Sequence, residues 1–237
     1  MGVPGLFQFI RKHYPVCVER VDHRNLLPVY DSLFIDANAV IHDISHTDGA
    51  TSIVSYEVLA ARLFSELDHL ISFINPQKFI FIAVDGAVPR CKLNQQRRRR
   101  YQSCAAQSQN EINEDTFDTN VISPGTEFME RLNEIIKYYI QLRMEKDIAW
   151  KKLKVVYSSY RYPGEGEHKI MEYLRCSINE GHYDNKERNI IYGSDMDLVL
   201  LASTLHKKNI DIIRDDFIPG LTYNETPSDR VGLNTRD

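Results

Sequence analysis

The chain has 237 residues, of which 43% are hydrophobic and 26% are charged, and its formal net charge is −4. This length and composition predict a globular protein of one large or at most two small domains, with room for a substantial core. The negative net charge excludes binding of nucleic acid through overall basicity, so any such function requires a local basic patch.

The cysteines and the apolar segments exclude further classes of protein. The four cysteines have neither CxxC nor Cys/His spacing, so neither a disulfide framework nor a structural zinc site is predicted. A reducing compartment fits this pattern, and we expect a cytoplasmic protein, with a nuclear location as the alternative. No stretch reaches about 18 uninterrupted apolar residues, and no signal-peptide pattern is found, so we expect no membrane association.

In chain order, the sequence first predicts a short amphipathic helix that Pro15 stops, and then a buried strand over residues 29–37. A helix is expected over residues 55–74, because leucines recur on one of its faces. A second buried strand follows at residues 78–86. The segment 88–109 is basic and polar, and we expect it to form a helix followed by a mobile loop.

The second half of the chain continues this alternation. The expected elements are a helix over residues 126–147, a strand over 153–160, a helix over 168–178, a strand over 188–193, a helix over 198–208 and a final strand over 209–215. Strands that alternate with helices predict an α/β fold with a mostly parallel central sheet flanked by helices and right-handed crossovers.

Acidic residues stand at the ends of four of the predicted strands. They are Asp36, Asp85, Glu165, Glu167, Asp195 and Asp197. The carboxyl ends of parallel strands meet at one sheet edge, where ligands bind. Crowded carboxylates raise one another's pKa unless a cation holds them ionised, and hard oxygen ligands suit Mg²⁺ or Mn²⁺. Such a cluster can hold two divalent ions about 4 Å apart for an in-line phosphoryl displacement. The alternative is that these acids are solvated strand ends or helix caps.

A basic segment follows Asp85 closely. In helical geometry its residues Lys92, Gln96, Arg99 and Arg100 fall at positions i, i+4, i+7 and i+8, and so share one face. Such a face can grip a terminal phosphate, because Arg forms bidentate hydrogen bonds and Lys supplies a point charge. Four arginines in isolation also fit a solvated helix or a nuclear-import signal. Their position beside the predicted metal site favours phosphate binding.

Two polar residues follow Asp36 in the same predicted turn and helix. Asn38 comes two residues later, and His42 lies close enough in sequence to line the same cleft. His42 could stack there on a base. A lone histidine more often has a structural role.

Six segments of the chain resemble, in this order, the Xrn family of 5′→3′ exoribonucleases. They are MGVPGLFQFI, FIDANAVIH, VDGAVPRCKLNQQRRRRY, SPGTEFM, PGEGEHKIMEYLR and GSDMDLVLLASTLH. The resemblance spans residues 1 to about 214 and is specific, because long contiguous strings match. It implies a FEN/PIN-like nuclease core that uses Mg²⁺, or Mn²⁺, to degrade single-stranded RNA from a 5′-monophosphate end.

The same resemblance assigns roles to the residues named above. It makes the six acids the catalytic, metal-binding residues. It places Lys92, Gln96, Arg99 and Arg100 in a pocket for the 5′-phosphate, and it has His42 stack on the first base. We expect Asn38 to contact the substrate beside His42.

The resemblance also implies a division of the chain. Residues 1–214 would form the nuclease domain, and residues 215–237 a polar tail or a connection to the family's second conserved region. That region supplies a further metal-binding Asp, and neither Asp215 nor Asp216 lies in a matching motif. Two other functions stay open. A flap-type DNA nuclease would use the same acid cluster, and an RNA-binding regulatory module would turn over weakly without the second region.

Overall fold

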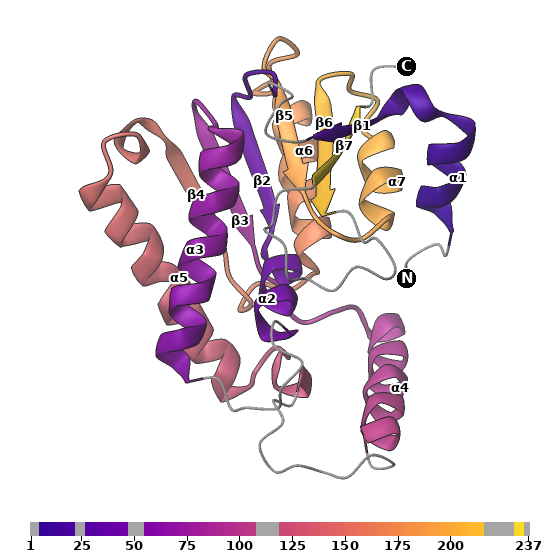
Figure 1. Ribbon diagram of the computed structural model, residues 1–237, viewed down its shortest axis with the longest axis vertical. Helices are drawn as coiled ribbons and strands as arrows, with labels where there is room; N and C mark the ends of the chain where they lie inside the picture. Colours follow the sequence, from indigo (N-terminus) through magenta and orange to yellow (C-terminus); the bar gives the residue numbers. More distant parts are fainter. Residues whose placement is uncertain (1–4, 22–26, 47–54, 108–118, 216–229, 235–237) are drawn as a thin grey trace.

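The computed structural model describes residues 5–21, 27–46, 55–107, 119–215 and 230–234. Its centre is a seven-stranded sheet with the strand order β1-β7-β6-β5-β2-β3-β4 (Figure 1). The strands are β1 Val18–Val21, β2 Ser32–Asp36, β3 Phe79–Ala83, β4 Lys154–Ser158, β5 Asn189–Tyr192, β6 Ile210–Asp215 and β7 Arg230–Asn234. Strands β2 to β6 run parallel, and β7 pairs antiparallel with both β6 and β1. The predicted α/β architecture with a mostly parallel sheet is confirmed.

Helices cover both faces of this sheet. The helices of the described residues are α1 Leu6–His13, α2 Ala37–His46, α3 Tyr56–Ile74, α4 Arg90–Gln107, α5 Glu127–Lys146, α6 Gly166–Asn179 and α7 Asp197–Ser203, with short 3-10 turns at Pro15–Cys17, Thr119–Val121 and Trp150–Lys152. All of them except α4 lie against a face or an end of the sheet (Figure 1). Within the part of the chain that the structure describes, no helix combines the length and the apolar composition that a membrane span requires.

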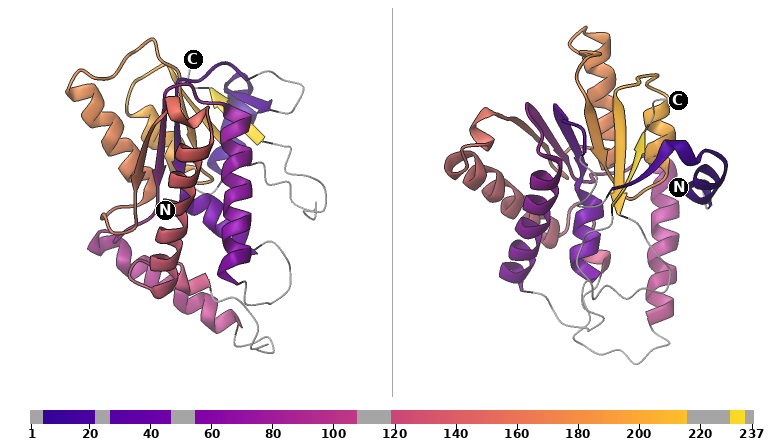
Figure 2. Two further views of the ribbon diagram at one scale, coloured as in Figure 1. Left: turned by 90° about the vertical axis from the view of Figure 1, so that its left-hand side faces the viewer. Right: turned by 45° about the horizontal axis from the view of Figure 1, so that its top comes forward.

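The alternation of side chains along each strand divides the core into two layers. On one face, Leu33 and Ile35 of β2 pack with α2, α3 and α5. On the other face, Phe34 of β2 packs with Ile170 of α6 and Leu198 of α7. Figures 1 and 2 show α4 outside both layers, beyond the edge at which the parallel strands end.

The two long helices of the first layer form as the sequence predicts. In α3 the Ser55 side chain accepts a hydrogen bond from the Val58 N–H, and Leu59, Leu63, Leu67 and Leu70 are buried on one face. In α5 the cap is Thr126, and the apolar stripe is buried at Phe128, Leu132, Ile136 and Tyr139 and partly exposed at Ile135. Apolar periodicity is a local signal, and the two helices predicted over residues 55–74 and 126–147 are confirmed.

The structure differs from the sequence prediction at two short strands. Residues 18–21 form β1, which was not predicted, and residues 230–234 form β7 inside the expected polar tail. The strand predicted over residues 209–215 is present as β6, but it is not the final strand, because β7 follows it. Both strands depend on pairing with distant residues, which local patterns do not encode. The mobile loop expected after α4 and the rest of the tail lie outside the described residues.

Candidate active site

The carboxyl ends of β2, β3, β4 and β5 meet at one edge of the sheet and bring the six predicted acids together. Asp36 ends β2, and Asp85 follows β3. Glu165 occupies the N-cap position of α6 and Glu167 lies in the first turn of that helix, while Asp195 and Asp197 stand at the start of α7. Asp36 interacts electrostatically with Asp85, Glu167 and Asp195, and Glu167 interacts with Asp195, Glu165 and Asp197. The acids therefore form one cluster.

Hydrogen bonds tie the ends of three elements to one another at this cluster. Asp36 Oδ1 accepts from the backbone N–H of Asn38, 3.2 Å away. The Asn38 side-chain oxygen accepts from the backbone N–H of Asp85 at 3.0 Å. Asp85 Oδ1 accepts from the backbone N–H of Gly166 at 2.7 Å. This series of bonds links the ends of β2 and β3 to the start of α6, so the acids are held on fixed backbone.

Two glycines allow the backbone to approach Asp36. A Cβ atom on Gly166 would collide with Asp36 Oδ1. A Cβ atom on Gly193 would lie 2.8 Å from Leu198 Cδ2 and 3.5 Å from Asp36 Cβ. Neither glycine has a positive φ, so space rather than backbone conformation requires them.

Burial and mutual repulsion raise the pKa values of three of the acids. Burial, with Asp195 and Glu165 adding to it, raises the pKa of Glu167 to about 7. Burial and the neighbouring Asp85 carboxylate raise the pKa of Asp36 well above its ordinary value. The pKa of Asp85 is raised by burial and by Glu165. The site therefore holds more negative charge than its own residues balance.

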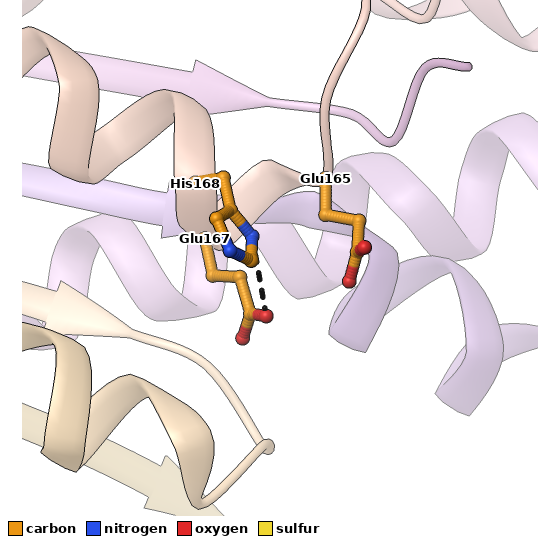
Figure 3. A group of neighbouring side chains, drawn as sticks. All are labelled: Glu165, Glu167 and His168. Carbon is orange, nitrogen blue, oxygen red and sulfur yellow. Dashed lines mark ion pairs between the residues drawn. The ribbon is translucent and has the colours of Figure 1, made fainter. Parts of the chain in front are cut away.

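The site has the properties of a divalent-cation site. Glu167 is 4% exposed, and its Oε2 atom is buried without a hydrogen-bond partner among the described residues. Ligand atoms of Glu165, Glu167 and His168 lie within 4.8 Å of one another (Figure 3). A hard cation such as Mg²⁺ or Mn²⁺ would bind such oxygen donors and would neutralise the repelling carboxylates. The residues present therefore fit the predicted metal.

Sequence reasoning did not include His168 or Lys169 in the site. His168 Nδ1 lies 3.5 Å from Glu167 Oε1, and its side chain is exposed. Lys169 is 6% exposed and donates hydrogen bonds to two backbone carbonyls. Burial lowers the pKa of Lys169 to about 8, although Asp85 and Asp36 favour its charged form. The one signal in the sequence for Lys169 was its position directly before Ile170, on the face of α6 that is buried.

The basic helix α4 reaches the acid cluster at Lys92. The ammonium group of Lys92 forms an ion pair with Glu165. Burial lowers the pKa of Lys92, but the hydrogen bond to Glu165 and the nearby negative charges outweigh it, so the pKa is raised. The first turn of α4 is thereby joined to the start of α6.

The side chains of α4 differ in their exposure, and the phosphate-binding role expected for one face stays a prediction. Lys92, Gln96 and Arg100 are partly buried, whereas Arg97 and Arg98 are exposed. The side chain of Arg99 lies outside the described part of the chain. No acidic residue occurs between residues 86 and 110, so the helix is a local basic patch on an acidic protein.

Asn38 and His42 lie one turn apart on α2, and both are partly buried. The side-chain oxygen of Asn38 accepts a hydrogen bond from the backbone N–H of Asp85, so this contact holds the backbone of the site. The substrate contacts predicted for both residues stay predictions.

The family comparison and the curated relatives agree with one another. A family model described as XRN 5'-3' exonuclease N-terminus matches residues 1–216. The 5'-3' exoribonuclease 1 of Homo sapiens is 37% identical over 91% of this chain and 13% of its own length. The 5'-3' exoribonuclease 2 of Arabidopsis thaliana is 33% identical over 93% of this chain and 26% of its own length. The chain therefore spans between about an eighth and a quarter of the length of these relatives.

The comparison of structures gives a more distant similarity. The catalytic core of Rad2 in complex with DNA substrate aligns with a TM-score of 0.49 at 13% sequence identity. The alignment covers 98% of this chain and 54% of that chain.

Proposed function

Because the chain belongs to the XRN 5'-3' exonuclease family, we propose that it is a metal-dependent 5′→3′ exoribonuclease that acts on single-stranded RNA with a 5′-monophosphate. The observation that carries the proposal is the cluster of six acids, in which Glu167 Oε2 is buried without a partner among the described residues. The names of the curated relatives support the same activity.

The six acids, with Glu167 at the centre of their interactions, would hold divalent cations, Mg²⁺ or Mn²⁺. Bound there, the cations would activate a water molecule and stabilise the leaving oxygen of an in-line phosphoryl displacement. The protein supplies the alignment: Asp36, Asp85 and Gly166 are joined through backbone hydrogen bonds at 2.7–3.2 Å. Ligands on fixed backbone keep the reacting groups in place without reorganisation.

The 5′ end of the RNA would be bound by α4. Lys92 is joined to Glu165, so a phosphate held by Lys92, Gln96 and Arg100 would lie beside the acid cluster. We assign Arg99 to the same pocket from its helical position. His42 would stack on the first base, and Asn38 would lie beside it. Because Lys92 is shared between Glu165 and this phosphate, binding of the 5′ end and of the metal would be coupled.

A comparison of substrates tests this proposal. Purified protein is given RNA and DNA of the same sequence, each with a 5′-phosphate or a 5′-hydroxyl and an end label, in Mg²⁺ or in EDTA. We expect degradation only of 5′-phosphorylated RNA in Mg²⁺, starting from the 5′ end. Equal cleavage of DNA would indicate a flap-type nuclease instead. RNA binding without cleavage would indicate an RNA-binding regulatory module.

A further inference from the structure

Lys169 is a buried cation at the base of the acid cluster. It is 6% exposed, although it follows Glu167 by only two residues. Lysine is almost never fully buried unless its ammonium group is paired. The two hydrogen bonds that the structure gives this ammonium group go to backbone carbonyls rather than to a carboxylate.

The ammonium group joins two strands at the point where their pairing ends. Lys169 Nζ donates to the carbonyl oxygen of Val84 at 2.7 Å and to that of Ser159 at 2.8 Å. Val84 directly follows β3, and Ser159 directly follows β4. The Val84 N–H donates to the carbonyl oxygen of Ser158 at 2.9 Å, which extends the pairing of the two strands by one residue. Lys169 thus bridges the next pair of backbone groups.

Beyond this bridge the two segments 84–87 and 159–164 contact each other directly. The Gly86 N–H donates to the carbonyl oxygen of Gly164 at 2.8 Å, and the Gly164 N–H donates to that of Ala87 at 2.9 Å. The Lys169 stem packs against Gly164, since its Cγ atom lies 3.7 Å from the place that a Cβ atom would take there. One segment contains Asp85, and the other leads directly into Glu165.

We propose that Lys169 is a positioning residue whose two hydrogen bonds hold the segments 84–87 and 159–164 at the separation that lets Asp85 and Glu165 face the same cation. This inference rests on the proposed function in one respect, that these acids bind a divalent cation. Lys169 acts through the backbone beside Asp85 and touches neither the substrate nor the metal.

A role through charge alone predicts the opposite effect on metal binding. By Coulomb's law, removing a positive charge beside carboxylates strengthens their attraction for a cation. Loosening the segments that position Asp85 and Glu165 weakens the binding of the cation. Partners that orient the ligands of a metal typically contribute about 10- to 100-fold to affinity or activity. The sign of the change in metal affinity therefore separates the two roles.

The experiment measures Mn²⁺ binding to the whole chain without RNA, by titration followed with electron paramagnetic resonance. Lys169→Met keeps the apolar stem and removes the donors, so we expect Mn²⁺ to bind about 10- to 100-fold more weakly. The control is Lys137→Met, which removes an exposed lysine from α5. Unchanged or tighter Mn²⁺ binding by Lys169→Met would overturn the proposal. RNA cleavage is measured separately, so a wild-type protein that binds Mn²⁺ but does not cleave RNA contradicts the proposed function alone.

A second variant covers the case in which Lys169→Met does not fold. Lys169→Gln removes the charge but keeps an N–H donor, and we expect it to bind Mn²⁺ more weakly than wild type, with a smaller loss than Lys169→Met. Unchanged or tighter binding by this variant overturns the proposal in the same way. If circular dichroism shows that neither variant folds, the proposal is also overturned, because Lys169 would then be required for the fold as a whole.

Discussion

The side-chain oxygen of Asn38 accepts a hydrogen bond from the backbone N–H of Asp85, 3.0 Å away, although 47 residues separate them in sequence. The bond connects the segment after β2 with the segment after β3, and so aligns two of the six acids. It is a long-range contact between two parts of the site, made by a residue that is not an acid.

Replacing Asn38 with Ala removes the partner of this partly buried N–H. We expect the free energy of unfolding in urea to fall by about 1 kcal/mol, the typical contribution of one hydrogen bond. We also expect kcat to fall, because Asp85 loses its alignment. Asn94→Ala, at an exposed position of α4, is the control and should change stability little. Equal stability of the two variants would show that the bond to Asp85 contributes nothing.

Asp195→Ala should abolish RNA cleavage and leave RNA binding largely intact. The reason is that loss of a metal ligand reduces metal occupancy more than contact with the substrate. Asp36→Ala should behave in the same way, since it removes a carboxylate that interacts with Asp195. Cleavage and binding are measured on the same labelled RNA, with the exposed Asp184→Ala as the control. Full activity of Asp195→Ala would exclude catalysis by the acid cluster.

The metal-free protein should become less stable as the pH rises from about 4.5 to 7. The pKa of Glu167 is raised from 4.5 to about 7, so the folded protein keeps a proton that the unfolded chain releases. Stability falls with rising pH wherever the folded state binds more protons than the unfolded state. A pKa shift of this size corresponds to a change of about 3 kcal/mol in the free energy of unfolding. The measurement stays below pH 8, because the lowered pKa of Lys169, about 8, makes stability rise with pH above that value.

Urea denaturation in EDTA across this pH range checks the effect. Glu167→Gln should flatten the curve, whereas the exposed Glu145→Gln should leave it unchanged. Saturating Mg²⁺ should also flatten it, because a bound cation keeps the carboxylates ionised. A wild-type curve that rises with pH in EDTA would contradict the expected direction.

The extent to which the sequence predicts this protein depends on how local each signal is. Strands β2, β3 and β5 are apolar runs that lead into acids, and this local pattern is enough to locate Asp36, Asp85 and Asp195. Parallel topology then requires these acids to share one sheet edge. The first step needs only a few neighbouring residues, and the second needs only the alternation of strands and helices along the chain.

Features that depend on distant contacts were missed. Strand β7 exists through its pairing with β6 and β1, and its five residues have no strong strand pattern of their own. From the sequence, a charged residue such as Lys169 is expected on the surface. Its role follows instead from its burial and from its hydrogen bonds to the carbonyl oxygens of Val84 and Ser159. Tertiary environment decides such positions, so local patterns assign them to tail or to surface.

Gly166→Ala should reduce activity although alanine is the better helix former. Helix propensity alone would stabilise α6 by up to about 1 kcal/mol. The added Cβ atom would collide with Asp36 Oδ1, so either Asp36 or the start of α6 must move. We expect weaker Mn²⁺ binding and a lower kcat, with the helix retained by circular dichroism. Wild-type Mn²⁺ affinity in this variant would show that the site tolerates the displacement.

The two sides of α4 should contribute differently to recognition of the 5′ end of the RNA. Arg100 is partly buried on the same side as Lys92 and Gln96, while Arg97 is exposed. A charge-assisted hydrogen bond contributes about 1.5 to 3 kcal/mol, so Arg100→Ala should lower kcat/KM on 5′-phosphorylated RNA by about 10- to 100-fold. The loss should be much smaller on 5′-hydroxyl RNA, because the partner of Arg100 is absent there. Arg97→Ala should weaken the binding of both substrates slightly, and this loss should become smaller as the ionic strength rises, because salt screens exposed charges. Equal losses on both substrates for both variants would show that α4 is a general electrostatic surface. A pocket that binds the 5′-phosphate must instead distinguish 5′-phosphorylated from 5′-hydroxyl RNA.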